Sequence, residues 1–326
     1  MKPSEENNYF PISPEMLNPH VLTDFKVYLK HGNRYVLYTK EREEFSEHLK
    51  KKLVDNGIET VYIPFDQQAS YESYVFDNFE WILSDSEIPL DVRSKVFLET
   101  TSKQVCSIFQ SKLPALDETT LEGIHHIVSS SLSFLSTPGA LENIGQFISH
   151  DYETFTHSVH VFTYTMSLMQ SLAKDWEEEA FIKVGVGALL HDIGKVHIPN
   201  STLNKPGKLD REEWETVKLH PVHGMRMCTN VALSQTSLNC ILFHHEKFDG
   251  SGYPSGMKEE EIPLPVRIIT CCDVYDAITS KRAYAPAQTP FSALKIMSNE
   301  MQGAFDLTVF KEFIEVLGKA GEKSGA

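Results

Sequence analysis

The histidines of this 326-residue chain gather in one stretch, where carboxylates are interleaved with them. Nine of the fourteen histidines lie between His150 and His245. Seven side chains of this region and the one that follows are candidate metal ligands: His157, His191, Asp192, His220, His244, His245 and Asp273. Mixed imidazole and carboxylate ligands suit divalent iron, manganese, zinc, cobalt or nickel, and seven groups exceed what one four- to six-coordinate ion can use. We therefore expect two ions, bridged by a carboxylate such as Asp192 and activating a water between them.

Three of these residues, at two places in the sequence, stand out because they interrupt apolar stretches. His191-Asp192 ends the apolar stretch "VGVGALLHD", and Gly194 follows at once, where it is suited to stop a helix. Asp273 lies inside the apolar run "VRIITCCDVYDAI". An ionised carboxylate buried without a partner is costly, and a metal ion is one partner that would offset this cost.

The remaining candidates are expected on or at the ends of helices. Glu153 and His157 are four residues apart in a helical stretch, so they share a face and could reach the same ion. His220 and the pair His244-His245 each close an expected helix. Taken singly, a histidine at a helix end is more often a structural residue than a ligand. Together, these residues favour a metal centre in the core of a helical bundle, where ligands project inward from facing helices.

Hydrophobic periodicity predicts that the second part of the chain is helical. Helices are expected at residues 121–135, 141–148, 153–173, 177–192, 211–220, 232–246, 265–280 and 290–301. A Pro/Asn/Gly-rich loop precedes Asp210, which is expected to cap the next helix together with Glu213. The predicted fold is an all-α catalytic helical bundle at residues 121–318.

A small α/β domain is expected before this bundle, at residues 1–110. Residues 22–39 form two β-rich runs around "KHGN", which predicts a hairpin. A helix at 41–55, the strand-like "IETVYIP" and further helices from Tyr71 onward complete the module.

Two segments are not expected in either domain. The helical pattern breaks at residues 111–120, which indicates a linker, and residues 319–326 are expected to form a disordered tail.

Composition excludes several classes of protein. The formal net charge is -15, and both the first 110 residues and the rest carry more acidic than basic residues, so DNA, RNA and anionic membranes are not expected partners. No secretory signal or membrane span is apparent. Five cysteines without a C-x-x-C pair fit reduced thiols. We therefore expect a cytoplasmic protein.

Four motifs in this order resemble the HD-GYP family: "HDIGK" at 191–195, "NKPGKL" at 204–209, "HHEKFDGSGYP" at 244–254 and "DVYDAITSKRAY" at 273–284. That family is similar to the broader HD metal-dependent phosphohydrolases, and its usual activity is hydrolysis of cyclic di-GMP. The resemblance covers roughly residues 120–318 and does not extend to residues 1–110.

The resemblance implies a role for each matching residue. It makes His157, His191, Asp192 and Asp273 ligands of one ion, and Asp192, His220, His244 and His245 ligands of the second. Iron is the first expectation for the metal, with manganese, zinc, nickel or cobalt as alternatives.

Three further residues are expected to meet the substrate. Lys195, also a candidate catalytic residue, and Arg282 are expected to face the phosphodiester as cations. Tyr253 is expected over the site or packed under its loop. Gly250 and Gly252 are expected to supply the positive φ of that loop, which the resemblance also associates with GGDEF-type diguanylate cyclase domains as partners.

The sequence departs from the family pattern at three places. Glu153 stands where many members have Tyr, as in a subset that looks able to hold a third ion. "RAYA" at 282–285 replaces the common "RPYR", and Phe248 stands where Trp or Tyr is usual. His160, His197 and His223 match no family ligand and are expected to be structural or to orient ligand rings.

Three functions follow as hypotheses. The first is a phosphodiesterase that hydrolyses cyclic di-GMP to pGpG or GMP through a metal-bridging hydroxide. The second, motivated by "RAYA", is a cyclic di-GMP sensor of low activity that signals through its N-terminal domain. The third is a di-iron protein that acts on another substrate, by redox chemistry.

Overall fold

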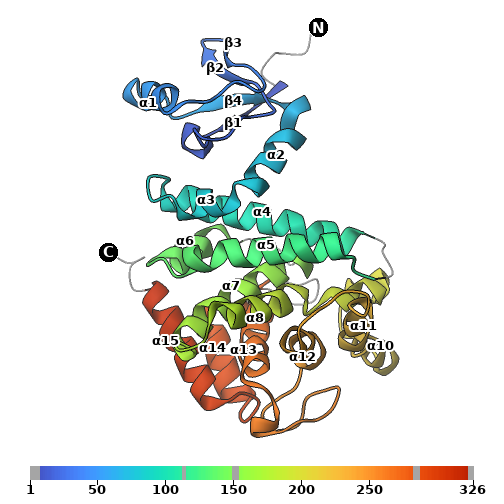
Figure 1. Cartoon of the computed structure of the whole chain (residues 1–326). Coiled ribbons are helices and arrows are strands. Elements are labelled where there is room, and N and C mark those ends of the chain that lie inside the picture. Colours follow the sequence, from blue (N-terminus) through green and yellow to red (C-terminus); the bar gives the residue numbers. More distant parts are fainter. Residues whose placement is uncertain (1–7, 112–114, 149–153, 282–286, 322–326) are drawn as a thin grey trace. The chain divides into compact units, whose positions relative to one another are not determined.

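The computed structural model describes residues 8–111, 115–148, 154–281 and 287–321. The chain divides into two compact units, Met1–Thr100 and Thr101–Ala326 (Figure 1). The division falls inside helix α4 (Leu90–Gln110), slightly before the limit expected for the N-terminal domain.

The smaller unit contains a four-stranded antiparallel sheet in the order β1-β4-β2-β3. Its strands are β1 (Tyr9–Ile12), β2 (Val27–His31), β3 (Arg34–Thr39) and β4 (Val61–Pro64). The predicted hairpin is β2 and β3, and Gly32 takes the positive φ of 59° that its turn requires.

Three helices of the smaller unit accompany this sheet: α1 (Glu47–Asp55), α2 (Gln68–Asp77) and α3 (Phe79–Ser84). Their core is aromatic and aliphatic, with Phe25, Phe45, Ile63 and Phe79 fully buried. The order of helices and strands is that of the predicted α/β module, with β1 as an addition.

The larger unit is built from helices joined by loops, and none of its described residues belongs to a named strand. Its helices are α5 (Glu118–Leu135), α6 (Ala140–Phe147), α7 (Thr154–Leu172), α8 (Glu178–Leu190), α9 (Asn200–Leu203), α10 (Arg211–Val217), α11 (His220–Met227), α12 (Gln235–Phe243), α13 (Leu264–Thr279), α14 (Pro290–Glu300) and α15 (Leu307–Gly321). Short 3-10 turns lie at Ile193–His197 and Glu259–Glu261. The predicted all-α bundle is confirmed.

Helix α7 forms the centre of this bundle. Every residue from His157 to Met169 is buried, as expected for a helix that other helices surround on all sides. Helices α5, α8, α13 and α15 contact it. In Figure 1, α13–α15 lie on one side of α12, and α10 and α11 lie on the other.

Two glycines let α8 approach its neighbours closely. A Cβ at Gly185 would lie 2.6 Å from Val128 of α5 and 2.9 Å from Phe162 of α7. A Cβ at Gly187 would lie 2.6 Å from the Cβ of Cys240 in α12. Because these approaches leave no room for side chains, the "GVG" of α8 fixes the helix that delivers His191 and Asp192.

Several predicted boundaries are wrong. The expected helix 211–220 is two helices, and His220 begins α11 instead of closing α10, because Pro221 fits only the first turn of a helix. Helix α5 begins at Glu118, where the Asp117 side chain accepts the Thr120 N–H, so it takes over part of the expected linker. Helix α15 was not expected, and it continues to Gly321 into the expected tail.

Within the described ranges, the helices lack the combination of length and apolar character that crossing a bilayer requires.

Candidate functional site

The seven predicted ligand residues converge at one end of the bundle. They come from the start of α7 (His157), the end of α8 (His191, Asp192), the start of α11 (His220), the end of α12 (His244, His245) and the middle of α13 (Asp273). Six of them are buried, and His245 is partly exposed. The packing of five helices therefore brings together residues that are far apart in the sequence.

Asp192 lies between two groups of histidines. Its Oδ2 is 3.7 Å from Nε2 of His157 and 3.5 Å from Nε2 of His191. Its Oδ1 is 3.3 Å from Nε2 of His220 and 3.8 Å from Nε2 of His244. One carboxylate thus faces two sets of imidazole nitrogens with its two oxygens.

The same division appears when donor atoms are grouped by proximity. His157, His191 and Asp192 form one set whose ligand atoms lie within 4.8 Å of one another. Asp192 with the three other histidines, His220, His244 and His245, forms the second. Asp273 borders both sets, because its Oδ1 lies 3.0 Å from Nε2 of His157 and its Oδ2 lies 3.5 Å from Nδ1 of His245.

Three of the histidines are held in the same way by the backbone. Nδ1 of His191, His220 and His244 donates to the carbonyl oxygen three residues earlier, at 2.8, 2.7 and 2.9 Å respectively. A ring that donates through Nδ1 in its neutral form presents a bare lone pair at Nε2. The local turn of the chain therefore fixes the tautomer that a metal ligand needs.

The arrangement of the ligand atoms in the cluster suits binding of a cation better than hydrogen bonding among the side chains themselves. Nε2 of His220 and Nε2 of His244 lie 3.1 Å apart, although both carry lone pairs, and such pairs repel unless a proton or a metal lies between them. Nε2 of His191 and Oδ1 of Asp192 are buried atoms that make no hydrogen bond in the described part of the chain. Buried polar atoms seldom remain unsatisfied. The residues present therefore fit a metal centre.

The electrostatics of the site favour neutral rings beside ionised carboxylates. Burial lowers the pKa of His191 and His244, and it lowers the pKa of His245 to about 3. Burial alone would raise the pKa of Asp192, but the Lys195 ammonium and the neighbouring imidazoles hold it well below its usual range. Neutral imidazole and ionised carboxylate are the forms that bind metal ions.

Asp276 is a residue of this site that sequence reasoning missed. Its Oδ2 accepts from Nδ1 of His157 at 2.7 Å, and its Oδ1 accepts from Nδ1 of His160 at 3.0 Å. All three side chains are buried. Asp276 follows Asp273 by three residues on α13, and this helical spacing was the available signal. The expectation that His160 supports a ligand ring agrees with this geometry.

Lys195 and Tyr253 both lie against the cluster. The Lys195 ammonium forms an ion pair with Oδ2 of Asp192. The Tyr253 ring lies 4.8 Å from the His245 ring at an interplanar angle of 30°, so it covers the partly exposed histidine. His197 and His223 instead contact each other, with ring centroids 5.4 Å apart. Arg282 and Glu153 lie outside the described residues, as do residues 283–285 of "RAYA".

The loop that carries Tyr253 is anchored by Glu246, a second residue that the sequence did not reveal. The buried Glu246 carboxylate accepts the backbone N–H groups of Ser255, Gly256 and Met257 at 2.6, 3.1 and 3.1 Å. Phe248 packs below the guanidinium of Arg267, whose carbon lies 6.0 Å from the ring centre.

Two glycine interpretations change with the structure. Gly250 takes the expected positive φ of 79°, but Gly252 does not; a Cβ there would lie 2.4 Å from the Lys247 nitrogen. Gly194 does not end a helix in a left-handed conformation either. A Cβ at Gly194 would lie 1.9 Å from the His220 carbonyl oxygen, so this glycine permits the close approach of α11.

Comparison with known proteins identifies relatives of this region. A model described as the HD domain matches residues 144–309, about half of the chain. A cyclic di-GMP phosphodiesterase of Pseudomonas aeruginosa is 40% identical over 191 residues, which are 58% of this chain and 45% of that protein. A 3'3'-cGAMP-specific phosphodiesterase of Vibrio cholerae is 38% identical over 157 residues, which are 48% of this chain and 34% of that protein. The chain spans less than half the length of these relatives.

A solved structure shares the fold. An HDG"Y"P protein from Bdellovibrio bacteriovorus matches with a TM-score of 0.67 at 21% sequence identity, covering 95% of this chain and all of that one.

Proposed function

The chain belongs to the HD domain family, and from this premise we propose that it is a metal-dependent phosphodiesterase that hydrolyses cyclic di-GMP to pGpG or GMP. The observation that carries the proposal is Asp192, whose two oxygens face two separate groups of histidine nitrogens. The name of the Pseudomonas relative supports the choice of substrate.

We assign two divalent ions to these groups. His157, His191, Asp192 and Asp273 would hold one ion, and Asp192, His220, His244 and His245 would hold the other. Iron is the first choice, with manganese, zinc, nickel or cobalt as alternatives, because all of them accept imidazole and carboxylate ligands. A third ion would involve Glu153.

The ions, when bound, supply an acidified water as nucleophile and positive charge for the phosphodiester oxygens. The chain supplies the rest. Asp192 and the neutral imidazoles would hold the ions in place, and Lys195 sets a cation at the cluster that can pair with the phosphodiester. Arg282 is proposed as a second substrate cation. Tyr253 covers His245 and limits the access of water from that side. GGDEF-type domains are the proposed partners of its loop.

The test is turnover of cyclic di-GMP by anaerobically purified protein of known metal content, with Asp192→Ala and Asp175→Ala as a matched pair. Asp175 is an exposed carboxylate in the connection between α7 and α8. We expect hydrolysis by the wild type and by Asp175→Ala, and none by Asp192→Ala. Full activity of Asp192→Ala would refute the proposed mechanism. A fully metallated wild type that binds cyclic di-GMP without hydrolysing it would instead establish the sensor.

A further inference from the structure

An exposed tryptophan lies beside the site and has no part in the chemistry described so far. Trp214 is on α10, six residues before His220, and 46% of its surface is exposed. Its ring lies 6.2 Å from the Tyr253 ring in an edge-to-face arrangement at 80°. Tyr253 in turn lies 4.8 Å from His245. These three rings form an aromatic series that leads from the metal-ligand cluster to the surface.

We propose that Trp214 is a stacking platform for one nucleobase of the cyclic dinucleotide. This inference rests on the proposed function and adds a binding residue to it. The centre of the indole can lie no farther from the centre of the His245 ring than the sum of the Trp214–Tyr253 separation (6.2 Å) and the Tyr253–His245 separation (4.8 Å). In a cyclic dinucleotide each base is one sugar away from the phosphates, so a base can reach the indole while a phosphodiester faces the cluster.

The charge around Trp214 favours a base over a phosphate as its partner. Glu212, Glu213 and Glu215 are its sequence neighbours on the short helix, where Glu213 pairs with Lys205 and Glu215 with Lys218, and the whole chain carries a formal net charge of -15. An anionic substrate therefore gains little from general electrostatic attraction. Stacking on an aromatic face does not depend on charge, and every nucleobase offers such a face.

The position of Trp214 beside the inner rings, rather than its exposure alone, supports a role in binding. Packing explains the inner rings, because Tyr253 is held by its loop and lies against His245. Trp214 extends this series outward to solvent. A half-exposed aromatic side chain next to a ligand cluster can offer its ring for stacking of a nucleobase.

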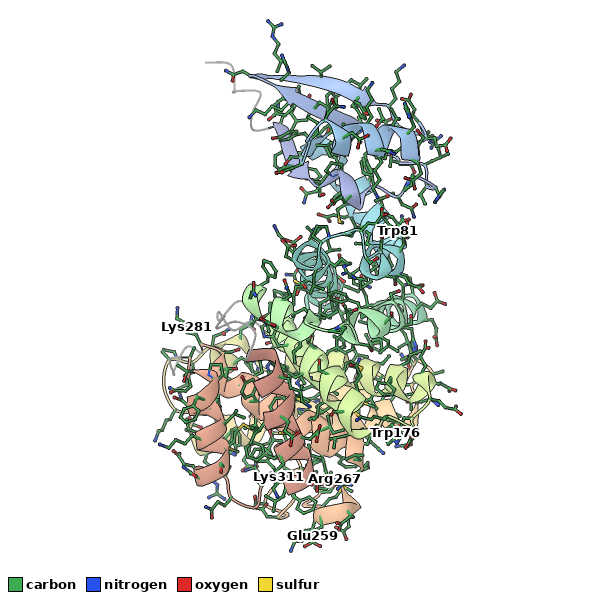
Figure 2. All side chains as sticks on the ribbon, turned by 90° about the vertical axis from the view of Figure 1, so that its left-hand side faces the viewer. Trp81, Trp176, Glu259, Arg267, Lys281 and Lys311 are labelled. Atoms are coloured by element: carbon green, nitrogen blue, oxygen red, sulfur yellow. The ribbon has the colours of Figure 1, made fainter. Side chains whose placement is uncertain are left out.

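The test compares Trp214→Ala with Trp214→Phe, and uses Trp176→Phe as the matched control. Trp176 is 38% exposed and lies in the connection that follows α7. Helix α7 separates that connection from His157 by about 20 Å along its axis. Figure 2 labels Trp176 at the margin of the larger unit and Trp81 in α3 of the smaller one.

Three readouts separate stacking from a structural effect. We expect the KM for cyclic di-GMP to rise roughly 10-fold in Trp214→Ala with kcat little changed, and only slightly in Trp214→Phe, because stacking contributes to binding rather than to the chemical step. Inhibition by inorganic phosphate, which has no base, should be the same in all variants. Cyclic di-GMP should quench tryptophan fluorescence in the wild type and in Trp176→Phe, but not in Trp214→Phe.

The failure of this inference differs from the failure of the proposed function. Hydrolysis with an unchanged KM in Trp214→Ala overturns the stacking role and leaves the phosphodiesterase standing. If cyclic di-GMP quenches the fluorescence of Trp214 but is not hydrolysed, the stacking role is supported and the proposed phosphodiesterase activity is wrong. If neither cyclic di-GMP nor 3'3'-cGAMP quenches the wild-type fluorescence, the inference is wrong.

Discussion

Replacement of Asp276 by Asn should weaken one metal site and spare the other. The Asp276 carboxylate accepts hydrogen bonds from Nδ1 of His157 and Nδ1 of His160, and the imidazoles hold its pKa well below the usual range despite its burial. An ionised carboxylate can only accept, so both rings donate to it. An Asn side chain offers one acceptor and one donor, and one ring then loses its partner or changes its tautomer.

The expected loss follows from the geometry of this contact. The hydrogen bond to His157 is 2.7 Å long and buried, which places it among charge-assisted bonds. Such bonds contribute about 1.5–3 kcal/mol, which corresponds to roughly 10- to 150-fold in affinity. Loss of the outer partner of a metal-binding histidine typically costs about 10- to 100-fold in metal affinity. We therefore expect the ion next to His157 to bind about 10- to 100-fold more weakly.

The assay is competition for the metal with a chelator of known affinity, which resolves two binding steps. Asp306→Asn is the control, because the Asp306 carboxylate is also paired, with Arg267 at 2.5 Å, and is partly buried, but contacts none of the predicted ligands. In Asp276→Asn one step should weaken and the other should keep its wild-type affinity. Two unchanged steps would refute the positioning role of Asp276.

Three further predictions concern the loop, the cluster and the packing beneath it. Glu246→Gln replaces an acceptor oxygen by a donor at the point where three backbone N–H groups of the Tyr253 loop converge. The KM for cyclic di-GMP should therefore rise several-fold while the metal content stays the same. An unchanged KM would show that the loop needs no carboxylate at this position. The pKa of His245 is about 3 in the folded protein and 6.5 in the unfolded chain, so between pH 3 and pH 6.5 the folded protein binds fewer protons than the unfolded chain. The Tm of the metal-free protein should therefore fall as the pH drops below 6.5. Each histidine of this kind contributes a slope of about 1.4 kcal/mol per pH unit, and a Tm that rises towards lower pH would contradict this sign. Gly194→Ala places a Cβ against the His220 carbonyl, so the free energy of unfolding, measured by thermal denaturation, should fall by roughly 1–3 kcal/mol or more. Wild-type stability of this variant would mean that α11 can shift freely.

The sequence indicated which side chains gather in one cluster, because their types, order and place at helix ends are all visible in it, and their role as ligands stays a prediction. The match to the HD domain confirms the family that these motifs indicated. Asp276 and Glu246 were missed for the opposite reason. Each is a carboxylate that accepts buried hydrogen bonds from groups at other positions of the sequence, and although the spacing from Asp273 places Asp276 on the same helix face, the local pattern does not identify these partners.

The boundaries that went wrong depend on tertiary contacts. Strand β1 was not predicted, since its four residues are stabilised by pairing with β4, about fifty positions later. Gly194 was read as a helix stop, because only the folded chain shows how near the His220 carbonyl lies. Periodicity could not divide α10 from α11, although Pro221 was a local signal that the helix begins anew there.

The most direct test of the central claim is a count of metal ions in Asp192→Asn and His191→Asn. Asp192 faces both groups of histidines, whereas His191 belongs to only one of them. Elemental analysis of anaerobically purified protein should find two ions per chain in the wild type, one in His191→Asn and none in Asp192→Asn. If Asp192→Asn retains both ions, or loses no more than His191→Asn does, Asp192 is not shared between two metal sites and the account is wrong.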